Sequence, residues 1–105
     1  MESELRLDLV IEGRVQGVGY RYSAKMKAES LGIRGSVQNL RDGSVFVTAQ
    51  GEKEAVDNFI RWCYKGPPGA IVRNIEKYLP YFCHIYISLA NYLHTRSLNS
   101  IHCNF

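Results

Sequence analysis

The chain has 105 residues and a net charge of +3, which suits one domain with a modest core and favours anionic small molecules without requiring nucleic acid. Its three cysteines form an odd set with no tight spacing, so they indicate neither a disulfide framework nor a zinc site and favour a reducing compartment. The N-terminal residues lack the basic start and apolar run of a signal peptide, which adds to the expectation of a cytoplasmic protein.

The first predicted strand leads into a glycine-rich segment. Residues 5–12 alternate apolar and polar side chains through Leu5, Leu7 and Leu9, which predicts a strand with one buried face. Residues 13–21 then read Gly-Arg-Val-Gln-Gly-Val-Gly-Tyr-Arg. Glycines allow several backbone N–H groups to converge, and an arginine closes the segment where a helix should begin, so it can cradle a phosphate-sized anion. A plain strand-to-helix turn explains the same pattern equally well, and the spacing matches neither a P-loop nor a dinucleotide fingerprint.

A helix and a hairpin follow. The helix is predicted from 21 to 31 and ends at Gly32. Its buried face is expected to carry Tyr22, Ala24, Met26, Ala28 and Leu31. Strands at 34–40 and 44–50 are joined through 41–43, where Asp-Gly between β-rich runs is typical of a hairpin.

The last elements complete a recognisable order. A second helix is predicted at 52–64, and a Gly-Pro-Pro-Gly run at 66–69 ends it before a strand at 71–78. The buried side of that helix is expected to carry Ala55, Val56, Phe59, Ile60 and Cys63. The βαββαβ order predicts an α+β, ferredoxin-like sandwich, in which an antiparallel four-stranded sheet has both helices on one face. That fold hosts many functions and names none by itself.

Five segments together resemble acylphosphatases. In chain order they are residues 13–21, 35–39, 42–45, 49–51 and 66–70. The resemblance runs without a detectable gap and ceases near the end of the last predicted strand. It implies a small enzyme that hydrolyses the carboxylate–phosphate anhydride bond of small acyl phosphates, by direct attack of water and without a metal or cofactor.

The resemblance also assigns roles to residues of this chain. It implies that Arg21 and the loop amides bind the phosphoryl group and that Asn39 positions the attacking water. The implied phosphate-binding loop comprises Gln16, Gly17, Val18, Gly19, Tyr20 and Arg21, and no metal ligand is implied. The chemistry agrees, because a planar guanidinium contacts two phosphoryl oxygens at once and asparagine orients water without abstracting its proton.

Each assigned residue also has a plainer explanation. Arg21 can pair with a surface carboxylate, and Asn39 can prepare the turn at 41–43, where asparagine is frequent. Tyr20 and Tyr22 are expected to pack and not to contact substrate. Because several motifs occur together and in order, we expect the catalytic roles for Arg21 and Asn39.

Two other functions are compatible with the fold. A non-catalytic module can hold phosphate or carbamoyl phosphate in the same loop, and an RNA-binding domain would expose aromatic residues on strands that here carry Val, Ile and Leu. We expect instead an enzyme with a small acyl phosphate as substrate and inorganic phosphate as product. It should act as a monomer, without nucleic-acid or membrane partners.

The C-terminal quarter differs in composition from the rest. Of the 23 charged residues, 22 precede Pro80 and only Arg96 follows it, whereas all three histidines follow it at a spacing too wide for a helical metal pair. We therefore expect an acylphosphatase-like domain at 1–79 and a divergent tail at 80–105, as an altered splice or reading frame would produce. Residues 82–89 fit one extra strand or helix equally well, and their apolar run is too short to span a membrane.

Overall fold

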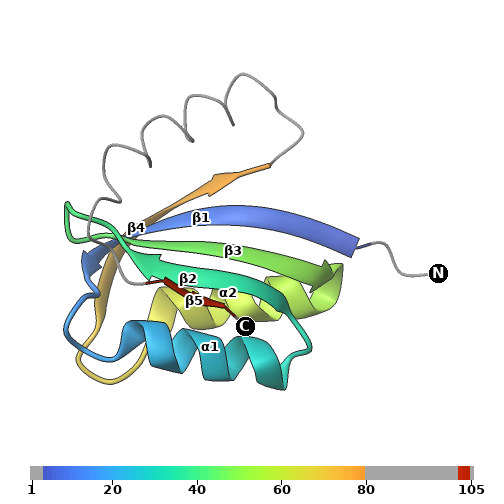
Figure 1. Ribbon diagram of the computed structural model, residues 1–105, viewed down its shortest axis with the longest axis horizontal. Coiled ribbons are helices and arrows are strands. Elements are labelled where there is room, and N and C mark those ends of the chain that lie inside the picture. Colours follow the sequence, from blue (N-terminus) through green and yellow to red (C-terminus); the bar gives the residue numbers. More distant parts are fainter. Residues whose placement is uncertain (1–3, 80–101, 105) are drawn as a thin grey trace.

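A computed structural model describes residues 4–79 and 102–104 of the chain (Figure 1). The elements are β1 (Glu4–Arg14), α1 (Tyr20–Ser30), β2 (Arg34–Asn39), β3 (Val45–Glu52), α2 (Lys53–Lys65), β4 (Ile71–Tyr78) and β5 (His102–Asn104). The predicted βαββαβ order and ferredoxin-like fold are confirmed, and element boundaries differ from the predicted ones by at most two residues. The strand or helix predicted at 82–89 lies outside the described residues.

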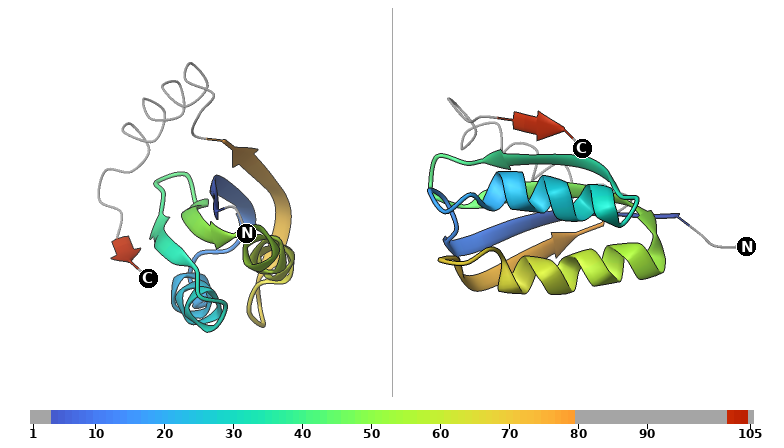
Figure 2. Two further views of the ribbon diagram at one scale, coloured as in Figure 1. Left: turned by 90° about the vertical axis from the view of Figure 1, so that its right-hand side faces the viewer. Right: turned by 90° about the horizontal axis from the view of Figure 1, so that it is seen from below.

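The sheet has five strands in the order β4-β1-β3-β2-β5, and all neighbours are antiparallel. Helices α1 and α2 cover one face of this sheet (Figures 1 and 2). The fifth strand, which the four-stranded prediction did not include, pairs with β2 so that Val37 lies opposite Cys103. As a result β5 and β4 form the two edges of the sheet.

The core lies between the sheet and the two helices. The buried strand residues of this core include Leu7, Leu9, Ile11, Val37, Val45 and Val47. From α2 it receives Val56, Phe59, Ile60 and Cys63, as the spacing predicts. Alternation in β1 and the helical repeat in α2 therefore both point to the observed core.

The prediction for the buried face of α1 was wrong in part. Tyr22 is 68% exposed and Met26 is 49% exposed, whereas Tyr20, Ala24 and Ala28 are buried. The buried residues are spaced four apart, and each of the two exposed residues lies two positions, or about 200°, away from that row. The helix turns Tyr20 and two small alanines to the sheet and leaves Tyr22 and Met26 outside.

The opposite face of the sheet also contains buried residues. Asp8 and Val10 are fully buried in β1, and neither belongs to the core cluster beneath the helices. The polar neighbours of the Asp8 carboxylate are Thr48 and Arg6, whose Nε lies 3.6 Å from its Oδ1, beyond an ordinary hydrogen-bond length. Burial raises the pKa of Asp8 above its ordinary value, and nearby Arg6 and Thr48 offset part of that effect.

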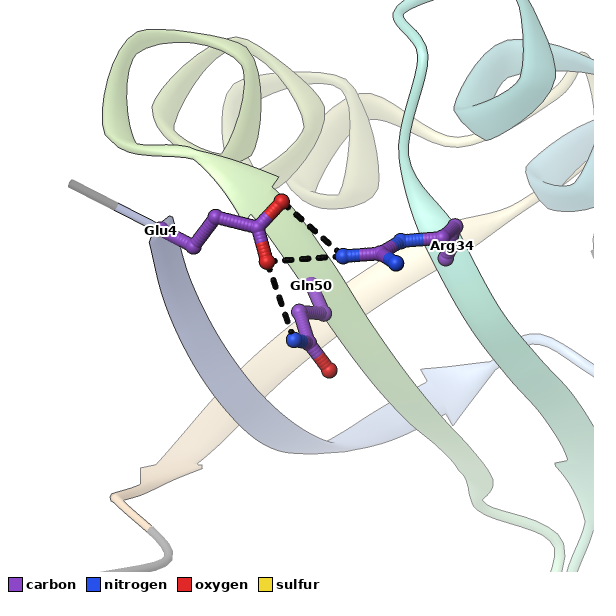
Figure 3. A network of polar contacts seen from close by, with 3 residues as sticks. All are labelled: Glu4, Arg34 and Gln50. Atoms are coloured by element: carbon purple, nitrogen blue, oxygen red, sulfur yellow. Dashed lines mark hydrogen bonds and ion pairs between the residues drawn. The ribbon is translucent and has the colours of Figure 1, made fainter. Parts of the chain in front are cut away.

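A polar network joins three strands near the start of β1 (Figure 3). Nη2 of Arg34 donates to Oε1 and Oε2 of Glu4 at 2.7 and 2.9 Å, and Nε2 of Gln50 donates to the same Oε1 at 3.1 Å. These side chains are exposed, so the network stabilises the fold only weakly. No helix in the described part of the chain is long and apolar enough to cross a membrane.

Candidate active site

The loop between β1 and α1 encloses a cavity of about 400 Å³ together with the end of β2. Arg21, at the start of α1, and Asn39, the last residue of β2, both line this cavity. They are 18 positions apart in the sequence, and the fold brings them to one site. The structure thus brings together the two residues for which the resemblance implies catalytic roles.

The backbone of the loop is shaped by two glycines. Gly17 and Gly19 both have a φ of 78°, in the left-handed region that side-chain-bearing residues resist. Gly19 precedes the first turn of α1, and no side chain of the described residues caps that turn. Gly17, Gly19 and Tyr20 line the cavity, so the N-terminus of α1, with the positive end of its helix dipole, lies beside it, an arrangement that favours an anion.

Gln16 connects this loop to the turn between β2 and β3. Its Nε2 donates to the backbone oxygens of Leu40 at 2.7 Å and of Ser44 at 2.8 Å. Asp42 stabilises this β2–β3 turn, because its Oδ1 accepts a hydrogen bond from the backbone N–H of Ser44 at 3.0 Å. The side chain of Gln16 therefore holds the loop beside Asn39, which leaves the main chain of Gln16 for the phosphate role assigned to it.

Tyr20 anchors the beginning of α1 in the core. It is 1% exposed, its hydroxyl donates to the backbone oxygen of Cys63 at 2.6 Å, and its ring lies 5.5 Å from that of Trp62. Burial raises the pKa of the Tyr20 hydroxyl, and also raises the pKa of the Cys63 thiol to about 12, so both groups are neutral at physiological pH. The expectation that Tyr20 packs is confirmed, although Tyr20 also borders the cavity. The same expectation for Tyr22 is wrong, because Tyr22 is exposed and lines the cavity.

The charge around the cavity is positive. Arg21 and Lys25 line it, and no acidic side chain among the described residues does so. Lys25 also pairs with Glu29 at 3.0 Å. Sequence reasoning missed Lys25, yet its position four residues after Arg21 places both on one side of the helix.

The described residues contain no group of three or more His, Cys, Asp or Glu side chains suited to a metal ion. What the site offers is a set of hydrogen-bond donors and two cationic side chains around a cavity of about 400 Å³, which has room for a phosphoryl group. Such an arrangement can bind a phosphoryl group and stabilise charge that develops on it.

Comparisons with known proteins agree on one family. A family model described as Acylphosphatase matches residues 7–79. An acylphosphatase of Acaryochloris marina is 50% identical over 76 residues, which cover 72% of this chain and 82% of that protein. An acylphosphatase of Thermotoga maritima is 48% identical over 70 residues, which cover 67% of this chain and 78% of that protein.

Solved structures of the same kind superpose on the chain. An acylphosphatase from Coxiella burnetii matches with a TM-score of 0.70 and 37% identity, over 72% of this chain and 80% of that one. One from Bacillus subtilis matches with a TM-score of 0.69 and 35% identity, over 70% of this chain and 82% of that one.

Proposed function

The chain belongs to the acylphosphatase family, and from this premise we propose that Arg21 and the loop amides bind the phosphoryl group while Asn39 positions the attacking water. The activity is hydrolysis of the carboxylate–phosphate anhydride bond of acyl phosphates, which yields a carboxylate and inorganic phosphate. The observation that carries the residue assignment is the cavity that Arg21 and Asn39 share.

Phosphoryl binding follows from the donors around the cavity. The guanidinium of Arg21 presents two parallel N–H groups, and the amides of residues 16–20 supply further donors from the loop. The charge of a transferring phosphoryl group spreads over its outer oxygens, and these donors stabilise it without forming a covalent bond. Lys25 adds positive potential at the same opening.

Water positioning follows from the place of Asn39 at the end of β2. Its amide can accept a hydrogen bond from water or donate one to it, but it is a poor base. It therefore contributes by holding water in line with the phosphorus atom, and the acyl carboxylate is a good enough leaving group for that to suffice.

Substitution of the two residues tests this assignment. Wild-type protein should hydrolyse benzoyl phosphate without added metal, and inorganic phosphate should inhibit competitively. Arg21→Gln should lower kcat/KM by about 100- to 1000-fold with the fold intact, because the loss of one charge-stabilising donor typically has an effect of that size. Asn39→Ala should lower kcat and leave the inhibition constant of phosphate nearly unchanged.

Arg61→Gln serves as the matched control, because Arg61 is an exposed arginine on α2 whose side chain bonds Asn58 away from the cavity. It should retain full activity. An active Arg21→Gln protein would rule out the site. Phosphate binding by a wild-type protein that hydrolyses nothing would favour instead the non-catalytic phosphate or carbamoyl-phosphate module.

We further propose that the protein acts in the cytoplasm as a monomer on a small-molecule acyl phosphate, without nucleic-acid or membrane partners. The buried free thiol of Cys63 and the mild net charge support this. Light scattering coupled to gel filtration tests the monomeric state. Cell fractionation tests the cytoplasmic location.

A further inference from the structure

A second hollow, of about 750 Å³, lies between α1 and the loop that follows α2. We call it the side groove. Its apolar lining consists mainly of Tyr22, Met26, Trp62, Pro67 and Pro68, and Lys27 and Lys65 add positive charge. Tyr22 and Met26 are the two large apolar side chains of α1 that packing against the sheet leaves exposed. Their exposure creates an apolar surface that the fold itself does not use.

The side groove adjoins the candidate active site. Tyr22 lines both cavities. Val18, within the phosphate-binding loop, approaches the far wall of the groove, since its Cγ1 lies 3.7 Å from where a Cβ on Gly69 would be. A ligand held by the loop can therefore extend over Tyr22 into the groove without crossing the protein interior.

The expected position of the leaving group also favours the side groove as the site of the acyl group. Gln16 bonds the loop to the turn beside Asn39, and Val18 approaches the loop after α2, so the phosphate-binding loop lies between these two neighbours. All three connections are at one end of the molecule (Figure 2, right). In an in-line displacement the leaving oxygen is opposite the attacking water. With water at Asn39, the acyl group leaves toward the groove.

We propose that the side groove binds the acyl group of the substrate and favours acyl phosphates with an aromatic or other bulky apolar acyl group over acetyl phosphate. This inference rests on the proposed roles of Arg21 and Asn39. Stacking against Tyr22 and contact with Met26 supply the preference, while Lys27 and Lys65 maintain a positive potential for an anionic substrate.

Truncation of Met26 is the sharpest test, because Met26 lines the groove and does not line the cavity with Arg21. We would measure kcat/KM for benzoyl phosphate and for acetyl phosphate. Met26→Ala should lower the benzoyl-to-acetyl ratio by about 10-fold, the size of effect expected for lost apolar contacts in a specificity pocket. Met26→Leu, which conserves volume, should keep the wild-type ratio.

Tyr64→Ala is the matched control. Tyr64 is 49% exposed, as Met26 is, but it lies on α2 outside the groove. Its replacement should leave the ratio unchanged. An unchanged ratio in Met26→Ala, or an equal fall for both substrates, would overturn the groove assignment. Failure of the proposed catalytic site would appear differently, as acetyl phosphate hydrolysis that survives Arg21→Gln.

Discussion

At the residue scale, Gln16 shows how one side chain can hold a binding loop in place. Its two hydrogen bonds link the loop after β1 to Leu40 and Ser44, which are 24 and 28 positions away in the sequence. Both carbonyls also accept a backbone hydrogen bond within their own turn, so removing Gln16 leaves neither without a partner. The main effect of removing the Gln16 side chain should therefore be a shift of the phosphate-binding loop away from Asn39.

We expect Gln16→Ala to destabilise the protein by about 1 kcal/mol and to raise the inhibition constant of phosphate about 5-fold. Urea denaturation and inhibition kinetics would measure these two effects. Gln50→Ala is the control, since Gln50 makes an exposed bond to Glu4 far from the loop. If phosphate inhibited both variants equally well, Gln16 would not position the loop.

Asp8 provides a pH-dependent prediction at the same scale. Burial raises its pKa in the folded protein above the ordinary 3.8, so the folded state binds the proton more tightly than the unfolded state does. The stability linked to this proton is fully present below pH 3.8 and is lost as pH rises through the raised pKa. At neutral pH the buried carboxylate is therefore destabilising.

We expect Asp8→Asn to raise the free energy of unfolding by about 1 kcal/mol at neutral pH, because an amide is less costly to bury than a carboxylate. Denaturation at a series of pH values should show this gain shrinking as the solution becomes more acidic. Asp57→Asn should give no such gain, since Asp57 is half-exposed and paired with Lys53 at 3.0 Å. If the free energies of unfolding of Asp8→Asn and wild type differed by the same amount at every pH, the raised pKa of Asp8 would be contradicted.

At the scale of elements, a bulge in β4, where Arg73 is the extra residue opposite Glu12 and Gly13, sets how the first strand meets β4. The pairing register shifts between Glu12 and Gly13, and Gly13 has a φ of 136°. A Cβ on Gly13 would overlap the backbone oxygen of Ile71 and lie 2.9 Å from the nitrogen of Arg73. Gly32, after α1, also has a positive φ of 72°, but the space around it is open.

The two glycines therefore separate backbone strain from steric overlap. We expect Gly32→Ala to cost about 1 kcal/mol from strain alone and Gly13→Ala to cost about 3 kcal/mol or more. Equilibrium denaturation measures both. Equal losses would mean that β1 and β4 separate easily at the bulge.

At the scale of the whole molecule, β5 connects the end of the chain to the edge of the sheet beside the site. His102 pairs with Gln38, which directly precedes Asn39. Without β5 the backbone of β2 becomes an open edge, and open edges favour association with another chain. The C-terminal residues thus bear on both stability and the position of Asn39.

A chain ending after Tyr78 should unfold about 4–8 °C below the full chain, the shift expected for a loss of about 1 kcal/mol in a domain of this size. It should also show concentration-dependent association in light scattering. Cys103→Pro in the full chain removes pairing at β5 and keeps the other residues, so it should reproduce most of the change. An equally stable, monomeric truncated chain would show that β5 contributes nothing.

The sequence by itself determined what depends on neighbouring residues. Alternation in β1, the helical repeat of α2 and the Asp-Gly turn establish the element order, because these signals act within a few residues. The five motifs between residues 13 and 70 together also pointed to the family, and the resemblance singled out Arg21 and Asn39 as predicted site residues.

Only the tertiary structure decided what depends on contacts between distant segments. A helical repeat defines a stripe, but which stripe of α1 meets the sheet depends on how the helix is placed, so Tyr22 and Met26 proved exposed. The burial of Asp8, the bonds of Gln16 and the shared cavity of Arg21 and Asn39 likewise depend on sheet register and helix position. No local pattern encodes those distances, because they arise when the layers of the fold pack together.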